Sequence, residues 1–553
     1  MRSAWLKALH SLIFLPLVFA ASAEEWSSRS IYQVFLLDVD NIDRALTRLM
    51  QIVTDRFALS TNSSAPCDTS KRTYCGGTWA GVTNHLDYIQ GMGFDALWIS
   101  PVVENMDGTA YGDGYHGYWT QDLNTISPHF GTSDDLHSLI NAVHARGMYI
   151  MFDVVVNHFA SVPTNTTPGF TFDYSKLAPF NNQAQYHPLC FISDYTNQTN
   201  VEQCWLGDAA LPLPDINTED SNVVTTLNTW IKNLVSTYNI DGLRIDTVKH
   251  IRRDFWPSFC SNAGVFTLGE VLSDDPNFVA PYMSSVDAVL DYPTWYNLRS
   301  AFVNTTGNLS ALTNSPSLYR LSNSSTTSPV RTAAFLENHD QARFASSTSD
   351  ISLTKNAMAW PFVGDGIPIM YYGQEQGYEG GSDPSNREAL WLSGYATGKP
   401  LVAHAKSLNV ARKLAIAGNA SFLSGEATWI PQSDPSSIML SKPPMLSLFT
   451  NIGTASSRQP TWTIPARLYP VNSTLVDTLS CRKVAVNGTG GDTSVTAVQG
   501  LPQVLIPLSM LTAQAGLCPS LVTSAQSAAP PSHRISLSLL VSTLSILAYS
   551  LEL

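Results

Sequence analysis

Four short segments carry the acidic and histidine side chains that could do chemistry. They are Asp153-Val-Val-Val-Asn-His158, Gly242-Leu-Arg-Ile-Asp-Thr-Val-Lys-His250, Gly269-Glu-Val271 and Phe335-Leu-Glu-Asn-His-Asp340. Two carboxyl groups about 5 Å apart can cleave a glycosidic bond with retention, one as nucleophile and one as acid and then base. Asp246 and Glu270 end consecutive apolar runs and could form that pair. Either one alone could be a capping or ion-pair residue, so their combination carries the prediction.

The segments that must position these residues read as alternating strands and helices. Helical patterns cover residues 134–146 and 223–238, and repeated β–α units of this kind indicate a parallel sheet covered by helices. The span favours a (β/α)8 TIM barrel over an open sheet, and in a barrel the carboxyl ends of the strands converge on the active-site face. The predicted apolar strands are residues 96–100, 149–155, 242–246, 267–270, 333–337 and 367–371.

Two regions depart from this alternation. Residues 158–215 are loop-rich and predict a small subdomain inserted after the third strand. From residue 406 to 518 short strands such as 445–449 and 503–506 predict a C-terminal antiparallel β-sandwich. We therefore expect residues 24–157 and 216–405 to form the two parts of the barrel.

The motifs together resemble the α-amylase family, glycoside hydrolase family 13, and most closely its secreted fungal members, from about Glu25 to Cys518. The likeness extends to residues 109–119, 254–257 and 372–376. It implies that Asp246 is the nucleophile, Glu270 the acid/base and Asp340 the transition-state stabiliser. Arg244 shares a strand face with Asp246 by period-two alternation, and its charge should keep that carboxylate ionised.

The resemblance also implies a substrate site and a calcium site. Calcium prefers hard oxygen ligands, and here it would tie the inserted subdomain to the barrel. The implied ligands are Asn157, Glu202, Asp215 and the backbone carbonyl of His250. The implied substrate-binding residues are Tyr111, His116, Tyr118, Trp119, His158, Tyr195, Lys249, His339, Asp383 and Arg387.

Both ends of the chain carry targeting patterns. Residues 1–23 read as a signal peptide, with basic residues, an apolar run and a small-residue cleavage site. Small residues (524–529), a short polar stretch (530–534) and an apolar tail (535–553) read as a GPI attachment signal. Residues 519–534 would be the linker with the attachment region, and Ser524 or Ser527 the attachment site. An uncleaved tail anchor is the alternative. We expect a secreted cell-surface protein, held at the membrane or linked to wall polymer.

Seven cysteines in an oxidising compartment suggest disulfides and one unpaired thiol. Spacing suggests Cys67–Cys75, Cys190–Cys204 and Cys481–Cys518, and the family resemblance supports these pairs. Cys260 would remain free, because the partner cysteines of a further family disulfide are absent.

Residues 34–51 interrupt the expected first strand. The family pattern joins residues 30–33 directly to residues 52–57, and a central barrel strand must pair every backbone group. The segment begins with Val and ends with Gln, whose codons can supply the ends of an intron, so we interpret it as a translated, unspliced intron. The alternative is a real insertion in which residues 34–37 replace the strand and a helix near residues 42–50 bulges out.

Three functions fit these features. One is endo-acting hydrolysis of α-1,4-glucan, and another is a 4-α-glucanotransferase acting on cell-wall α-glucan, which shares the covalent step. The transferases of the GPI-anchored subgroup tend to replace one active-site histidine, whereas His158 and His339 are both present here. The third is a non-catalytic glucan-binding protein, which would lack a catalytic carboxylate. The net charge of −13 argues against nucleic acid, and we expect a monomer.

Overall fold

The computed structural model describes residues 48–61, 63–165, 170–314 and 332–522. Eight parallel strands close into a barrel, in the spatial order β1-β12-β11-β10-β9-β8-β5-β2. This confirms the predicted (β/α)8 architecture. The strands are β1 (Leu49–Ile52), β2 (Ala96–Ile99), β5 (Tyr149–Val154), β8 (Gly242–Ile245), β9 (Phe266–Gly269), β10 (Ala288–Leu290), β11 (Thr332–Phe335) and β12 (Ile367–Tyr371).

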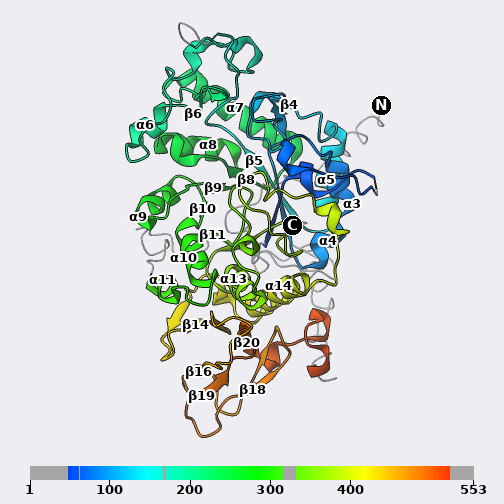
Figure 1. The fold of residues 1–553 in the computed structure, drawn as a ribbon, viewed down its shortest axis with the longest axis vertical. Helices are drawn as coiled ribbons and strands as arrows, with labels where there is room; N and C mark the ends of the chain where they lie inside the picture. The colour runs from blue at the N-terminus through cyan, green and yellow to red at the C-terminus, as the bar shows by residue number, and fades with distance from the viewer. Residues whose placement is uncertain (1–47, 62, 166–169, 315–331, 523–553) are drawn as a thin grey trace, which may run out of the picture.

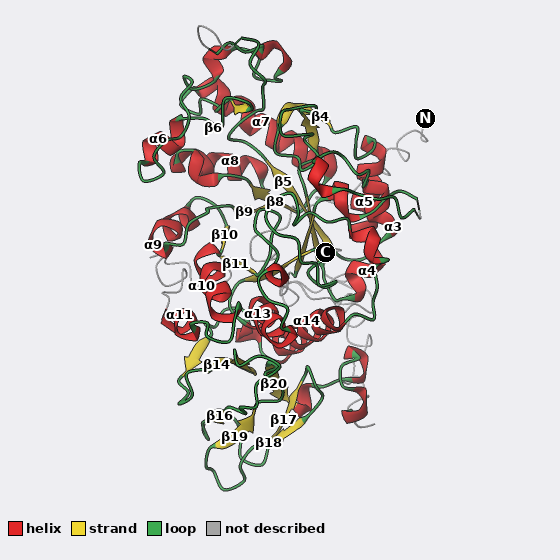
Figure 2. Ribbon diagram, in the orientation of Figure 1, coloured by secondary structure: helices red, strands yellow, loops and turns green. Residues whose placement is uncertain are grey.

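Alternation along each strand divides the core into two layers. Leu49 and Trp98 face the barrel interior, where they pack with side chains from the other strands. Met50 and Ile52 face outward into the larger core shared with the helices. Figure 2 shows these helices around the barrel. They include α3 (Trp79–Asn84), α4 (Leu86–Gly91), α5 (Ser133–Ala145), α7 (Ser221–Tyr238), α8 (Trp256–Ala263), α10 (Tyr292–Phe302), α11 (Leu309–Asn314), α13 (Ile351–Val363) and α14 (Pro400–Gly418).

Helix α7 shows how the sequence sets these elements. The Asp220 side chain accepts a hydrogen bond from the Asn222 backbone N–H and caps the amino end. Apolar residues then recur on one face, from Val223 to Tyr238, which buries that face against the barrel. Asn239 ends the helix in the left-handed conformation.

The two additional regions lie at opposite ends of the molecule (Figure 1). The subdomain after β5, the third barrel strand, is mostly loops, with α6 (Gln198–Gln203), β6 (Leu206–Gly207) and β7 (Pro212–Leu213). The C-terminal domain has a six-stranded antiparallel sheet and a two-stranded sheet around a shared core. Its strands are β13 (Thr428–Ile430), β14 (Ser437–Lys442), β15 (Met445–Thr450), β16 (Thr461–Ile464), β17 (Thr474–Asp477), β18 (Lys483–Ala485), β19 (Thr493–Thr496) and β20 (Gln503–Pro507).

The structure corrects three details of the sequence interpretation. The boundary expected at residues 405–406 falls inside α14, which continues unbroken to Gly418. Strand β10 was not predicted, because Ala288–Leu290 is too short to give a pattern. The first barrel strand includes Leu49, Met50 and Gln51. In the alternative with a real insertion, the helix expected near residues 42–50 is therefore wrong for Met50. That alternative also placed the strand at residues 34–37, whereas the barrel strand is β1. Residues 30–33 lie outside the described part.

Candidate active site

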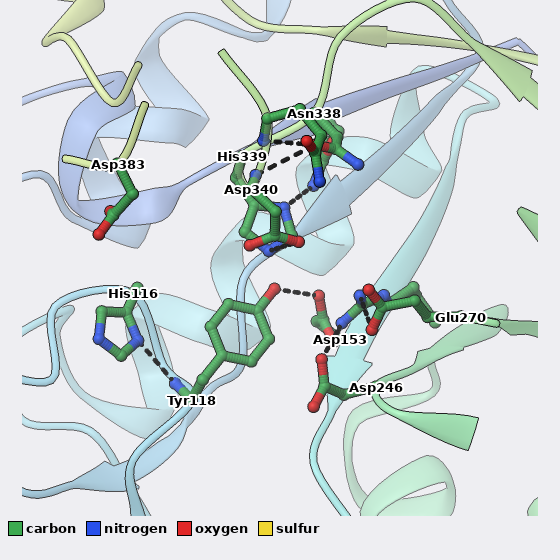
Figure 3. A network of polar contacts seen from close by, with 12 residues as sticks. His116, Tyr118, Asp153, Asp246, Glu270, Asn338, His339, Asp340 and Asp383 are labelled. Carbon is green, nitrogen blue, oxygen red and sulfur yellow. Dashed lines mark hydrogen bonds and ion pairs between the residues drawn. The ribbon is translucent and has the colours of Figure 1, made fainter. Parts of the chain in front are cut away.

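One buried guanidinium connects the two carboxylates predicted to react. Arg244 lies at the carboxyl end of β8, with Nη1 2.8 Å from Oδ1 of Asp246 and Nη2 2.8 Å from Oε2 of Glu270. Nη1 also contacts Oδ1 of Asp153 at 2.9 Å, and the other oxygen of Asp153 accepts the Tyr118 hydroxyl at 2.7 Å (Figure 3). Arg244 therefore holds carboxylates from three consecutive strand ends together.

Asp246 and Glu270, the two carboxylates predicted to react, both have a raised pKa. Burial raises the pKa of Asp246 to about 6, and Arg244 opposes that rise. Burial raises the pKa of Glu270 to about 7, and Arg244 again opposes it while the charge of Asp246 adds to it. Arg244 therefore acts on Asp246 in the expected direction, but burial has the larger effect. The pKa of both carboxyl groups is thus raised by burial, and the neighbouring charge of Asp246 favours a proton on Glu270.

Asp340 faces these residues from the loop after β11. Its Oδ2 lies 3.2 Å from Nε2 of His339, and its Oδ1 lies 3.5 Å from Nη2 of Arg387. Its side chain is 35% exposed, whereas those of Asp246 and Glu270 are 9% and 11% exposed. Arg387 also pairs with Asp383 at 3.0 Å. Asp340 is therefore the carboxylate most open to a ligand.

Aromatic and imidazole rings form the opposite wall. The Tyr118 ring stacks on His339 with centroids 5.1 Å apart, and the Tyr118 backbone N–H donates to Nδ1 of His116. Trp119 packs edge-on against His116, and His158 Nε2 lies 3.2 Å from the Tyr118 carbonyl oxygen. Flat apolar faces beside hydrogen-bonding groups suit a sugar, which has both kinds of surface.

These residues line one pocket of about 330 Å³, within the size range of small-molecule sites. Sequence analysis missed Tyr115, Leu213 and Thr247, and also Arg72, whose Nη1 lies 3.0 Å from Oδ2 of Asp383. Arg72 could be identified only from the structure, because it lies in the loop closed by a disulfide and is far from the motifs in sequence. The predicted residues that line the pocket are Tyr111, His116, Tyr118, Trp119, His158, Asp246, Glu270, His339, Asp340, Asp383 and Arg387.

Two predicted substrate residues lie outside this pocket. Tyr195 is 62% exposed, and the Lys249 ammonium lies 5.6 Å from the centre of its ring. Lys249 also donates to the Leu272 carbonyl oxygen at 2.7 Å, two residues beyond Glu270. The pair lies near Glu270 but does not line the pocket, so its contact with substrate stays a prediction.

Comparisons with known proteins agree with this geometry. The family model "Alpha amylase, catalytic domain" matches residues 51–414, and "Alpha-amylase, domain C" matches residues 433–526. The chain belongs to the α-amylase family. Alpha-amylase 1 of Schwanniomyces occidentalis is 42% identical over 91% of this chain and 94% of its own length. The α-amylase of Saccharomycopsis fibuligera is 41% identical over 92% of this chain and 97% of its own length.

A solved structure supports the same assignment to the α-amylase family. The structure of an α-amylase from Malbranchea cinnamomea superposes with a TM-score of 0.81 and is 42% identical in sequence. The match covers 90% of this chain and all of that one. The fold and the catalytic domain are therefore shared along most of the chain.

The residues that the α-amylase resemblance implies for calcium lie between the subdomain and the barrel. Asn157 and Asp215 are adjacent, since the Ile216 N–H donates to the Asn157 carbonyl and residues 158 and 215 form a β-bridge. Glu202 lies on α6, which packs against the turn that contains His250. Among the described residues no cluster of three or more His, Cys, Asp or Glu could hold a metal, so a cation here would also need amide and backbone oxygens.

The cysteines of this α-amylase family member pair as predicted. Disulfides join Cys67–Cys75, Cys190–Cys204 and Cys481–Cys518, and Cys260 is free. Within the described ranges, no helix is long and apolar enough to cross a membrane. The expected signal peptide and apolar tail lie outside those ranges.

Proposed function

We propose that this protein is a retaining, endo-acting α-amylase that hydrolyses α-1,4-glucosidic bonds in starch- or glycogen-type glucan. The observation that carries the proposal is the single guanidinium of Arg244 bridging Asp246 and Glu270 beneath a pocket that also contains Asp340. A pair of carboxyl groups with separated pKa values is what retaining cleavage requires.

The reaction follows from this arrangement. Glu270 donates its proton to the glycosidic oxygen while Asp246 attacks the anomeric carbon, which breaks the bond and forms a glycosyl-aspartate. Glu270, now a carboxylate, then takes a proton from water, which attacks the anomeric carbon and releases Asp246. Asp340 accepts hydrogen bonds from sugar hydroxyls, and His339 and Arg387 hold Asp340 in place.

Incubation with maltoheptaose tests hydrolysis against glucan transfer. Hydrolysis predicts shorter sugars and a rise in reducing ends that matches the number of bonds cleaved. Products both longer and shorter than the substrate, with few new reducing ends, would instead show a 4-α-glucanotransferase, because another glucan would replace water. Binding without cleavage would leave the third function, a non-catalytic surface protein.

Activity should depend on pH through the two carboxyl groups. Below about pH 6 Asp246 gains a proton and stops being a nucleophile, and above about pH 7 Glu270 loses the proton that it must donate. We therefore expect a bell-shaped plot of kcat/KM against pH, with its maximum between these values. Because the two carboxyl groups influence each other, each limb of the plot reports the pair and not one residue. Initial rates on maltoheptaose from about pH 4 to about pH 9 measure it. A profile that is flat through this range would contradict the assignment.

We also propose that calcium binds at Asn157, Glu202, Asp215 and the His250 carbonyl. Oδ1 of Asn157 and Oδ1 of Asp215 are both buried, and within the described residues neither has a hydrogen-bond partner. A buried oxygen that accepts no hydrogen bond costs free energy, and a hard cation such as calcium would give both oxygens a partner. The other Asp215 oxygen lies 2.6 Å from Nδ1 of His187, which orients the carboxylate.

Removing calcium should destabilise the junction between the subdomain and the barrel. Dialysis against EDTA is expected to lower Tm by several degrees, and added calcium, but not magnesium, should restore it, because magnesium demands a smaller octahedral site. Asp215→Asn should have a low Tm that calcium no longer raises. An unchanged Tm after EDTA, with calcium shown absent by elemental analysis, would disprove a structural calcium ion.

We propose, finally, that the protein works outside the cell. Three disulfides in the described part fit an oxidising compartment, and both terminal patterns fit secretion with a GPI anchor at Ser524 or Ser527. Release of the native protein from its source cells by phosphatidylinositol-specific phospholipase C, or by wall-degrading enzymes, would distinguish a membrane anchor from a wall linkage.

A further inference from the structure

Gln51 is a buried polar residue within the barrel. It precedes the last residue of β1 and is 2% exposed. Since Leu49 faces the barrel interior, alternation places Gln51 in the next inward-facing layer, at the carboxyl ends of the strands. In register with Gln51 lies Trp98 on β2, and Trp98 donates to Asp153. Gln51 therefore lies beside the residue that bonds Asp153, the third carboxylate held by Arg244.

The side-chain amide of Gln51 makes one close contact. Its Nε2 lies 2.5 Å from Nδ1 of His339, while its Oε1 is buried and has no partner in the described part of the chain. On the other side of the ring, Nε2 of His339 lies 3.2 Å from Oδ2 of Asp340. The imidazole is thus held between an amide and a carboxylate.

The chemistry of these three groups selects one arrangement of protons. The Asp340 carboxylate can only accept, so it requires N–H at Nε2 of His339. In a neutral ring Nδ1 then carries the lone pair, and the Gln51 amide must present its NH2 to it. With the amide turned round, Nδ1 would need the proton and the bare Nε2 would face the carboxylate of Asp340. Only one orientation of Gln51 satisfies both contacts.

We infer that Gln51 is a positioning residue for the reaction: it donates to Nδ1 of His339 and so keeps the proton on Nε2, where His339 meets Asp340 and the sugar. The inference rests on the proposed function for its catalytic consequence, but the hydrogen-bond arrangement does not depend on it.

The surroundings of His339 keep the ring neutral. A neutral imidazole carries a proton on only one of its two nitrogens, so one tautomer must be favoured. Burial lowers the pKa of His339 well below its usual value, and the charges of Arg244 and Arg387 lower it further. Tyr118 stacks on one face of the ring, and Trp98 meets it edge-on. These two rings fix the position of the imidazole but bond neither ring nitrogen, so the tautomer depends on Gln51 at Nδ1 and Asp340 at Nε2.

The first test observes the tautomer directly. The protein would be labelled with 15N-histidine, and His339, one of 12 histidines, would be identified by the signals missing from His339→Gln. We expect the parent to show a protonated Nε2 and a bare Nδ1 at neutral pH. Gln51→Glu keeps the shape but as a carboxylate can only accept, so it should place a proton on Nδ1 in addition to the one on Nε2. A protonated Nδ1 in the parent would overturn the inference, even if the protein proved to be a transferase.

The second test asks whether Gln51 acts through His339. Gln51→Met should lower kcat/KM on maltoheptaose by about tenfold or more, as loss of an orienting partner commonly does. The double variant Gln51→Met/His339→Gln should lie within about twofold of His339→Gln alone, since a residue that works through its neighbour adds nothing once that neighbour is gone.

A control variant separates positioning from stability. Met50→Leu changes the adjacent outward-facing residue of β1 at similar volume and should keep the parent kcat/KM. Parent-level kcat/KM for a folded Gln51→Met, or losses that multiply in the double variant, would show that Gln51 is merely structural.

Discussion

Glu270→Gln is expected to lower kcat/KM on maltoheptaose by about 10³-fold or more, because a poor leaving group then departs without a proton. The same variant should still react with α-maltosyl fluoride, since fluoride needs no acid to leave. Asp246→Asn should lose activity on both substrates, because it removes the nucleophile. Arg244 keeps Glu270 and Asp153 as partners in Asp246→Asn, so that variant should fold.

The contrast between substrates distinguishes these roles from damage to the fold. Asp87→Asn removes a surface carboxylate that pairs with Arg146 and should leave both activities unchanged. Circular dichroism and Tm would confirm folding for each variant. Equal losses on both substrates for Glu270→Gln, in a folded protein, would contradict its role as the acid.

A protein that lacks residues 34–51 is expected to fold and to keep kcat/KM within about twofold of the full chain, although the deletion removes most of a barrel strand. After the deletion, Ile31 takes the inward position of Leu49, Tyr32 takes the outward position of Met50, and a glutamine again precedes Ile52. We propose that this shorter chain is the functional product of a spliced transcript.

The deletion also removes Arg48, which is buried and paired. Arg48 is 1% exposed and pairs with Asp95 at 2.8 Å, and it also donates to the Asn409 carbonyl oxygen. Burial lowers the pKa of Arg412 to about 10 and that of Lys413 to about 8, and the charge of Arg48 lowers both further. The deletion puts Ser30 in place of Arg48, which removes one of these crowded cations but also a partner of the buried Asp95. Because Arg412 and Lys413 also attract Asp95, we expect the Tm to stay close to that of the full chain.

A deletion one residue shorter is the matched control. Removing residues 34–50 leaves two glutamines before Ile52 and moves Gln33 to the outward position of Met50, inside the apolar layer under the helices. Burying an amide there costs about 1–3 kcal/mol, so this variant should have a lower Tm or fail to fold. Sequencing of mature transcripts gives an independent check. Equal behaviour of the two deletions, or the segment present in most messages, would refute the proposal.

The barrel was predictable because its strands are buried on both faces and give continuous apolar runs, as residues 149–154 and 367–371 show. The catalytic residues were predictable because they follow such runs directly. Arg72 and Gln51 were not, since each acts through a partner distant in sequence, Asp383 and His339. In the full chain β1 is Leu49–Ile52, and residues 30–33, which also end in glutamine, stay the predicted strand of a chain without residues 34–51.

The most direct test of the proposed mechanism is capture of the covalent intermediate. Glu270→Gln would be incubated with α-maltosyl fluoride, digested and examined by mass spectrometry. The mechanism predicts a maltosyl adduct on the peptide that contains residues 242–247, located at Asp246, and α-maltosyl azide when azide is added. Turnover of α-maltosyl fluoride with no adduct at Asp246 and β-configured products would contradict it, because that outcome requires direct attack by water.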